Sequence, residues 1–348
     1  MSEFKINRII RKNVKGLKPY SSARDEYISD GTDMVFLDAN ENPFDNGVNR
    51  YPDPQQRSLK VVLAQQKGVS ADNLLLGNGS DEVLDLIFRA FCEPYKDNVI
   101  TMPPTYGMYK VLSGINAVDN REVLLTKGFE LDVDGILRIV DANSKVLFIC
   151  SPNNPTGNNF DEKAIAKLLN EFSGLVVIDE AYIDFAANES WLKRLGEFPN
   201  LIITQTLSKA YGMAGIRLGL CFASQEIIAV LNKIKPPYNV NQLTQERALS
   251  QILKSDLIKL EIVEILEQKS SLLKVLSEID FIEEIYPSDA NFVLVRVDNA
   301  NRRYRQLLDR GLVVRNRTNQ PLCENTLRFT IGTKSENLKL ISALKELV

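Results

Sequence analysis

The sequence predicts an α/β fold built on a mostly parallel β-sheet. Short runs rich in β-branched residues recur through the middle of the chain, and segments with helical spacing lie between some of them. Apolar strands that alternate with amphipathic helices are typical of a parallel sheet covered by helices on both faces. The chain has 348 residues, of which 44% are hydrophobic and 25% charged, so it is long enough for one large or two ordinary globular domains.

The predicted strands follow one another through the first two thirds of the chain. A short apolar strand from Leu74 ends at a Gly-Asn-Gly turn, and Ser80 behind this turn is a suitable helix N-cap. Asp161–Phe172 has apolar residues at helical spacing and acidic residues in its first turn, which predicts an amphipathic helix. The remaining predicted strands of this region are Asn98–Met102, Lys145–Cys150, Leu175–Asp179, Leu201–Thr206 and Arg217–Ala223.

A smaller α+β domain is predicted beyond the second third of the chain. Residues 242–278 combine many charges with Leu and Ile at helical spacing, which predicts one long helical region. We expect residues 50–240 to form the large domain, and residues 1–49 and 241–348 to form the small domain with an N-terminal arm. The elements predicted after the long helix are strands at Asn291–Val297 and Thr326–Ile331, a helix at Arg302–Arg310 and a helix at the C-terminus.

Composition excludes several classes of function. Lys+Arg 42 against Asp+Glu 45 gives a net charge of -3, which disfavours a nucleic-acid-binding protein. The absence of histidine excludes a Ser-His-Asp or Cys-His catalytic site and zinc sites with imidazole ligands. Four widely spaced cysteines form neither a disulfide framework nor a metal motif, so we expect no metal. The sequence contains no secretory signal and no apolar stretch of ~20 residues, so we expect a cytoplasmic protein that does not bind membranes.

The glycine-rich turn before Ser80 is a candidate anion site. The exposed amides at a helix start bind anions, and a strand leads directly into this turn. The dinucleotide fingerprint would require glycine where Glu82 stands, and the phosphate loop of nucleotide hydrolases would require Gly-Lys-Ser/Thr. Two interpretations remain for this segment, a single bound phosphate group and an ordinary capped turn.

Two further segments place polar residues at the ends of predicted strands. Ser151–Gly157 (SPNNPTG) follows one strand, and Asp179 ends the next strand and is followed by Glu-Ala-Tyr182. Open α/β sheets bind ligands at the carboxyl ends of their strands. An acid at the end of a buried strand needs a cationic or protonated partner. Taken singly, a Pro/Asn turn and a helix cap or ion pair are the simpler explanations of these segments.

The fourth candidate segment contains a lysine just past a predicted strand. Lys209 is flanked by hydroxyl residues and followed by small residues, and partial burial there would lower the pKa of its amine and suit it to covalent chemistry with a carbonyl group. A single lysine is usually a surface residue. Here, however, Thr206, Ser208 and Arg217 together form a suitable phosphate site beside the amine.

Together the four segments resemble the aspartate aminotransferase superfamily, the fold type I enzymes that use pyridoxal 5'-phosphate. The resemblance lies in the type, order and spacing of N-P-T-G, D-E-A-Y and T-L-S-K, with an arginine eight residues after the lysine. It implies a fold type I transferase, whose large domain has a mostly parallel seven-stranded sheet between helices beside a smaller α+β domain.

The resemblance also implies the role of each residue around the cofactor ring. Lys209 would hold the cofactor aldehyde and would then move a proton between the substrate α-carbon and the cofactor. Asp179 would bind the ring nitrogen and keep the ring protonated, so that the ring can withdraw electrons. Asn154 and Tyr182 would bind the 3'-oxygen of the ring, and Tyr106 would stack on its face. Lys209, Asp179 and Tyr182 are therefore the expected catalytic residues.

The same resemblance implies a set of contacts to the cofactor phosphate. Ser80 and Asp81 would contribute backbone amides, and the side chains of Thr206, Ser208 and Arg217 would complete the site.

A closer resemblance, to the histidinol-phosphate aminotransferase family, covers nearly the whole chain. It implies that Arg328 binds the α-carboxylate of the substrate, that Tyr20 and Arg315 bind the phosphate of histidinol phosphate, and that Tyr51 reaches the cofactor phosphate of a neighbouring subunit in a homodimer. The segment Asp38–Tyr51, rich in Asn, Asp, Gly and Pro, is predicted to be an ordered loop. The segments on which this resemblance depends are Leu37–Pro43, Arg50–Asp53, Tyr20, Val314–Arg315 and Leu327–Thr333.

The implied reaction exchanges an amino group between L-histidinol phosphate and 2-oxoglutarate, giving imidazole-acetol phosphate and L-glutamate, and histidine biosynthesis uses the reverse direction. Within the superfamily, a threonine-phosphate decarboxylase or an aromatic amino acid aminotransferase would have nearly the same cofactor residues. A cofactor-binding DNA regulator would need a further domain before Tyr51, where too few residues stand. A protein that only binds partners remains an alternative of another class, and it would show no cofactor absorbance dependent on Lys209.

Overall fold

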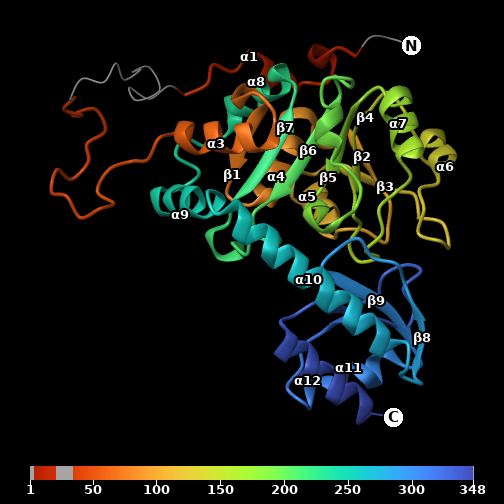
Figure 1. Ribbon diagram of the computed structural model, residues 1–348. Coiled ribbons are helices and arrows are strands. Elements are labelled where there is room, and N and C mark those ends of the chain that lie inside the picture. The colour runs from red at the N-terminus through yellow and green to blue at the C-terminus, as the bar shows by residue number, and fades with distance from the viewer. Residues whose placement is uncertain (1–3, 21–33, 348) are drawn as a thin grey trace.

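The computed structural model describes residues 4–20 and 34–347, and its larger part contains a seven-stranded sheet (Figure 1). The strand order is β1-β7-β6-β5-β4-β2-β3. Neighbouring strands from β6 to β3 are parallel, and β7 is antiparallel to both β6 and β1. The predicted mostly parallel sheet is therefore confirmed. The strands are β1 (Leu74–Gly77), β2 (Asn98–Thr101), β3 (Asp119–Glu122), β4 (Ser144–Cys150), β5 (Leu175–Asp179), β6 (Leu201–Thr206) and β7 (Gly219–Ala223).

Each face of this sheet has its own hydrophobic core. Side chains alternate along a strand, so in β4 Leu147 and Ile149 enter one core whereas Val146 and Phe148 enter the other. Strands buried on both faces consist of continuous apolar runs, as the sequence of β4 does. On the first face lie α3 (Arg57–Lys67), α6 (Val133–Arg138), α7 (Glu162–Glu171) and α9 (Gln242–Ile252). On the second face lie α1 (Lys12–Gly16), α4 (Ser80–Phe91), α5 (Met108–Ile115) and α8 (Gln225–Ile234).

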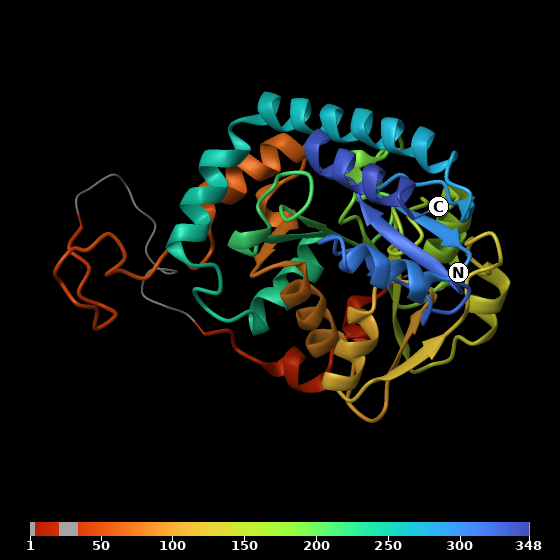
Figure 2. The same cartoon turned by 90° about the horizontal axis from the view of Figure 1, so that it is seen from below.

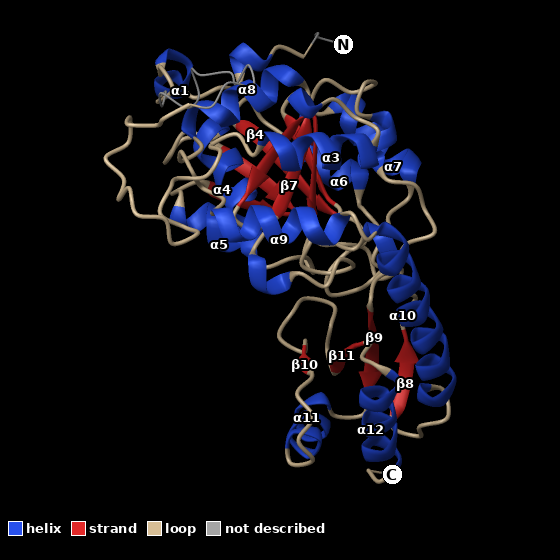
Figure 3. Ribbon diagram, turned by 60° about the vertical axis from the view of Figure 1, so that its left-hand side comes forward, coloured by secondary structure: helices blue, strands red, loops and turns tan. Residues whose placement is uncertain are grey.

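A four-stranded antiparallel sheet forms the smaller part of the molecule (Figure 3). Its order is β10-β11-β9-β8, and its core contains buried residues of β9, β11 and all three helices of this part. The view from below shows the long helix α10 running along one side of the molecule (Figure 2). The elements are α10 (Ser255–Leu276), β8 (Ile282–Ile285), β9 (Phe292–Val297), α11 (Ala300–Leu308), β10 (Arg315–Asn316), β11 (Thr326–Thr330) and α12 (Lys334–Lys345).

The helical region predicted over residues 242–278 consists of two helices in the structure. The helix ends at Ile252 and a second helix begins at Ser255. The reason is that the two helices belong to different cores: Ile252 of α9 packs beside the seven-stranded sheet, whereas Leu272 of α10 packs beside the four-stranded sheet. The helical periodicity of the sequence continues across this change of core, so periodicity alone did not show the break.

Strands β3, β8 and β10 were not predicted. Strand β3 has the polar sequence DNRE and pairs with a single neighbour, β2, at the edge of the sheet. An edge strand needs few apolar side chains, so β3 lacks the signal that identified the central strands. The division of the chain into domains at residues 50 and 240 stays a prediction.

The first described residues pack on the larger part of the molecule, and Ile6, Ile9 and Val14 are buried in the core that contains α4 and α8. Residues 34–56 contain no helix or strand, as predicted for Asp38–Tyr51, and most of this segment extends away from the body, whereas Gln56 at its end is buried (Figure 1). Within the described ranges, no helix is both long and apolar enough to span a membrane. The same ranges contain no group of three or more His, Cys, Asp or Glu residues placed to bind a metal ion.

Candidate active site

A cavity lies where β4, β5 and β6 end. The parallel register places Cys150, Asp179 and Thr204 side by side across these three strands, so the segments that follow the strands meet at one edge of the sheet. The start of α4 closes the cavity on another side. Ten residues predicted for the cofactor site line it together with Cys150 and Ala181, namely Ser80, Asp81, Tyr106, Asn154, Asp179, Tyr182, Thr206, Ser208, Lys209 and Arg217.

Asp179 is the last residue of β5 and is buried, with 2% of its surface exposed. The Tyr109 hydroxyl donates a hydrogen bond of 2.8 Å to its Oδ2, and the Thr204 hydroxyl donates one of 3.0 Å to its Oδ1. Burial raises the pKa of Asp179 to about 6, while these two hydrogen bonds act in the opposite direction. The carboxylate is therefore ionised above pH ~6 and can accept a further hydrogen bond from a cationic group in the cavity.

Lys209 projects its amine into the same cavity, and its Nζ lies 5.8 Å from the centre of the Tyr182 ring. Burial lowers the pKa of Lys209, and the nearby positive charges of Arg328 and Arg217 lower it further. A lowered pKa increases the fraction of neutral amine, which is the form that attacks a carbonyl carbon or accepts a proton.

The start of α4 and Arg217 lie close together at the cavity and are the groups that could hold an anion. Gly79 has φ +84°, and a Cβ there would lie 2.8 Å from Nη2 of Arg217. Gly219 on β7 packs just as closely, because a Cβ there would lie 2.2 Å from the backbone nitrogen of Ser80. Glycine at these two positions lets the Arg217 guanidinium and strand β7 approach the start of α4. The guanidinium therefore lies beside the backbone amides of the helix start.

Three polar groups line the middle of the cavity. The Tyr106 hydroxyl donates to Oδ1 of Asp81 over 3.0 Å, and the Tyr106 ring lies edge-on to the Tyr109 ring at 5.6 Å. Asn154 donates from Nδ2 to the Tyr182 hydroxyl over 3.3 Å. Burial raises the pKa of Tyr182, so its hydroxyl keeps its proton at neutral pH and is able to donate a hydrogen bond.

Arg328 connects the smaller sheet with the cavity. It lies on β11, and its Nη1 donates to Oδ1 of Asn154. Its guanidinium carbon lies 4.9 Å from the centre of the Phe292 ring. Burial lowers the pKa of Arg328, and Arg315 lowers it further. Arg315 stands opposite Arg328 on β10, but its side chain is exposed.

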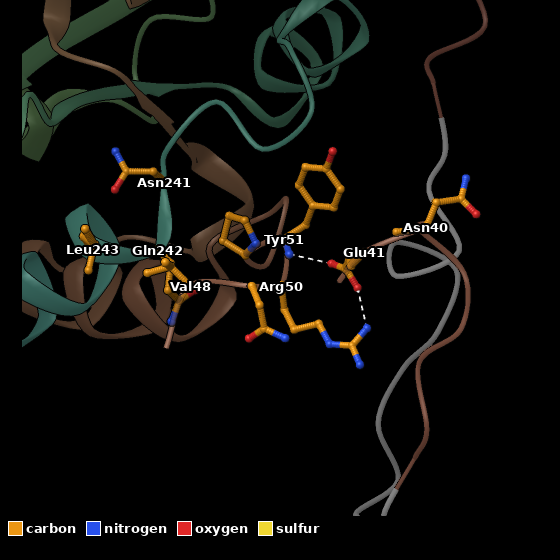
Figure 4. Close-up of a pocket in the computed structure, with 11 residues that line it drawn as sticks. Asn40, Glu41, Val48, Arg50, Tyr51, Asn241, Gln242 and Leu243 are labelled. Carbon is orange, nitrogen blue, oxygen red and sulfur yellow. Dashed lines mark hydrogen bonds and ion pairs between the residues drawn. The ribbon is translucent and has the colours of Figure 1, made fainter. Parts of the chain in front are cut away.

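Four predicted residues do not line the cavity, namely Arg315 and Arg328 on the smaller sheet and the tyrosines Tyr20 and Tyr51. Tyr51 lines a separate pocket on the extended segment, where its backbone nitrogen donates to Glu41 and its ring stacks on Tyr238 at 4.6 Å (Figure 4). Tyr20 is 71% exposed and lines another pocket, beside Pro54 and Lys233. Within the described part of a single chain, these two tyrosines do not meet the cofactor residues.

Several residues of the site were not predicted as site residues. Tyr109 bonds to Asp179 across 70 positions of sequence, and local spacing gives no signal for so distant a contact. Thr204 had a usable signal, because it stands two residues before Thr206 on a strand and therefore faces the same side. Cys150 ends β4 and lines the cavity, but its apolar surroundings resemble those of a core residue.

Comparison with known proteins identifies the family. The family model of class I and II aminotransferases matches residues 33–344. The chain belongs to the class I and II aminotransferases. Within this family, the chain is 64% identical over 346 residues to histidinol-phosphate aminotransferase of Flavobacterium johnsoniae, and the match covers 99% of both chains. It is 55% identical over 339 residues to the histidinol-phosphate aminotransferase of Parabacteroides distasonis, and this match covers 97% of the chain and 98% of the relative.

Solved structures of the family have the same fold. The structure of histidinol-phosphate aminotransferase from Clostridium acetobutylicum superposes with a TM-score of 0.80 at 25% identity, over 86% of this chain and 91% of that chain. The structure of the enzyme from Sinorhizobium meliloti, in complex with pyridoxal-5'-phosphate, superposes with a TM-score of 0.77 at 22% identity, over 86% and 84% of the two chains. The predicted fold type I architecture is thereby confirmed.

Proposed function

We propose that the protein catalyses pyridoxal-phosphate-dependent transamination between L-histidinol phosphate and 2-oxoglutarate, giving imidazole-acetol phosphate and L-glutamate, with the reverse direction used in histidine biosynthesis. The main support is the full-length identity of 64% to a histidinol-phosphate aminotransferase, together with one cavity that is lined by a buried acid, an amine of lowered pKa and a helix start beside an arginine.

The residues of the cavity fit pyridoxal phosphate. When bound, this cofactor withdraws electrons from the substrate α-carbon through its protonated ring. Asp179 would accept the hydrogen bond of the ring nitrogen and hold the proton there. The helix start at Ser80 and Asp81, with Arg217, Thr206 and Ser208, would bind the phosphate group.

The remaining groups would orient the ring and move protons. Asn154 and Tyr182 would donate to the 3'-oxygen of the ring, and the ring of Tyr106 would cover one of its faces. Lys209 would bind the aldehyde carbon through Nζ until a substrate amine replaces it. Its neutral Nζ would then take the proton of the substrate α-carbon and return it at the cofactor carbon, which explains how a chain without histidine performs acid-base chemistry.

The substrate would be oriented by the arginines of the smaller sheet. Arg328 would bind the α-carboxylate of glutamate through its two nitrogens, since a guanidinium matches a carboxylate in shape and charge. Arg315 and Tyr20 would bind the phosphate of histidinol phosphate.

A homodimer is part of this proposal. The extended segment 34–56 exposes several large apolar side chains, among them Val35 at 81%, Leu37 at 88% and Phe44 at 81%. Apolar side chains on a segment that extends from the body are well suited to packing on a second subunit. In such a dimer, Tyr51 would reach the cofactor phosphate of the neighbouring subunit. The cytoplasm stays the expected location.

The test is a single-turnover visible spectrum of the cofactor-loaded protein mixed separately with histidinol phosphate, phosphothreonine and phenylalanine. We expect the fastest conversion to the pyridoxamine form with histidinol phosphate. Conversion with phenylalanine alone would identify an aromatic aminotransferase, and release of carbon dioxide from phosphothreonine would identify a decarboxylase. Both results would contradict the proposed substrate.

A further inference from the structure

Three arginines share one face of the ribbon formed by β10 and β11. Arg315 and Arg328 are paired across the two strands. Arg317 continues the ladder, because its backbone nitrogen donates to the carbonyl of Thr326 over 2.9 Å. Side chains alternate along a strand, so Arg317 faces the same side as Arg315 and therefore the same side as Arg328. Of these three residues, Arg317 has no role in the proposed function.

This arrangement costs free energy in the protein alone. Like charges placed opposite each other destabilise a sheet. Burial lowers the pKa of Arg317 to about 10, with the charges of Arg328 and Arg315 as the next causes, so the guanidinium stays protonated at neutral pH. The structure shows no carboxylate within ion-pair distance of any of the three arginines in the ranges that it describes. The Nε atoms of both Arg317 and Arg328 are buried and have no hydrogen-bond partner there.

Unpaired buried donors and a concentration of positive charge are both relieved by a bound anion. Arg317 lies close enough to the cavity for its charge to act on the Tyr182 hydroxyl. Arg328 contacts Asn154 and Arg315 is exposed, and the half-buried Arg317 lies on the same face of the ribbon, where it can bind an anion together with them.

The two amino donors of the proposed reaction differ in the length and charge of the group next to the amino carbon. In glutamate the group next to the amino carbon is a carboxylate with one negative charge. In histidinol phosphate the same position carries a phosphate ester, which extends further by a C–O–P link and bears a charge of about -1.5 to -2 at neutral pH. One subsite must accept both groups, and of these two groups the phosphate ester reaches further from the amino carbon.

We infer that Arg317 is a specificity-determining residue that binds the phosphate monoester of histidinol phosphate together with Arg315, and that it contributes little to the binding of glutamate. This inference rests on the proposed function. It explains why the face has three arginines, since a carboxylate is satisfied by the guanidinium of Arg328 alone.

The experiment compares Arg317→Gln with wild type and with Arg305→Gln, which removes an exposed arginine of α11 on the same small part of the molecule. Stopped-flow spectra of the cofactor-loaded proteins give the half-saturating concentration of each amino donor in a single turnover. We expect Arg317→Gln to raise this concentration about 10- to 100-fold for histidinol phosphate, because charged hydrogen bonds to the phosphate are lost. For glutamate the rise should be less than about 3-fold. Equal changes for both donors, or no change, would overturn the inference.

Two further measurements separate a binding role from a structural one. Removing one of three like charges should leave the melting temperature of the ligand-free variant equal or higher, whereas a structural role for Arg317 predicts a lower one. Arg317→Lys should fold like wild type and recover part of the affinity, because it restores the charge without the planar guanidinium. A lower melting temperature in Arg317→Gln with no recovery in Arg317→Lys would contradict the inference.

Inorganic phosphate tests the anion site without catalysis. With the cofactor bound, phosphate should raise the melting temperature of wild type and of Arg305→Gln more than that of Arg317→Gln. If wild type does not react with histidinol phosphate, the proposed function is wrong, and the inference then depends on the melting temperatures with phosphate alone. An equal rise of the melting temperature in all three proteins would overturn the inference. A smaller rise in Arg317→Gln would support it.

Discussion

Tyr109→Phe removes one hydroxyl from the centre of the site and leaves its packing intact. Tyr109 is buried and its ring stacks on Phe148 at 5.0 Å, an interaction that phenylalanine preserves. The substitution removes the 2.8 Å hydrogen bond that the Tyr109 hydroxyl donates to Oδ2 of Asp179. A hydrogen bond to a charged group contributes about 1.5–3 kcal/mol, and 1.36 kcal/mol corresponds to one pKa unit. The pKa of Asp179, which is about 6 in the cofactor-free protein, should therefore rise by roughly 1–2 units.

The consequence is a change in how cofactor binding depends on pH. Only the ionised Asp179 can hold the proton of the ring nitrogen, so binding weakens as the pH falls through the pKa of this carboxyl group. The wild-type protein should lose affinity for pyridoxal phosphate below pH ~6, and Tyr109→Phe should begin to lose it below pH ~7–8. At pH 7 the ionised fraction of Asp179 falls from about 0.9 to about 0.5–0.1, so the variant should bind the cofactor about 2- to 10-fold more weakly.

Equilibrium dialysis of pyridoxal phosphate between pH 5.5 and 9 measures this shift. Tyr286→Phe is the matched control, because the Tyr286 hydroxyl is hydrogen-bonded to Arg296, away from the cavity. Its pH midpoint should equal that of wild type. If Tyr109→Phe also keeps the wild-type midpoint, then the hydroxyl does not stabilise the ionised form of Asp179 and the reasoning is wrong.

Three further predictions concern the phosphate end of the site and the dimer. Arg217→Ala should lower cofactor affinity about 10- to 100-fold in dialysis, and full retention would exclude its role in binding the phosphate. Gly219→Ala places a Cβ 2.2 Å from a backbone nitrogen of α4 and should destabilise the protein by about 1–3 kcal/mol in urea unfolding, whereas Gly196→Ala, with nothing within 4 Å, should change little. Mixing inactive Lys209→Ala with Tyr51→Phe should restore activity above that of either variant, because one site of each heterodimer then has both residues; no gain would contradict a shared site.

Much of the fold and of the cofactor site could be predicted from the sequence. Buried strands such as Leu175–Asp179 are continuous apolar runs, so their position is visible in the sequence alone. The polar segments that follow them must meet, because the ends of parallel strands share one edge of the sheet. Lys209, Asp179 and Asn154 line one cavity for this reason.

What could not be predicted depends on contacts between distant parts of the chain. The bond from Tyr109 to Asp179 joins a helix on one face of the sheet to the end of a strand, and no periodicity encodes it. Similarly, the hydrogen bond from Arg328 to Asn154 spans 174 positions. The face with three arginines can be recognised only when the register of β10 against β11 is known. Strand β10 has two residues and is too short for a strand signal in the sequence.

The break between α9 and α10 marks the place where the backbone passes from the larger sheet to the smaller one. Ile252 of α9 packs in a core of the larger sheet, whereas Leu272 of the helix that starts at Ser255 packs in the core of the smaller sheet. Side chains also join the two parts, because Leu294 of β9 packs in the same core as Ile252 and Arg328 donates to Asn154. The position of Arg328 at the cavity is therefore held by packing between the two sheets, and not by the backbone connection at Leu253 and Lys254 alone.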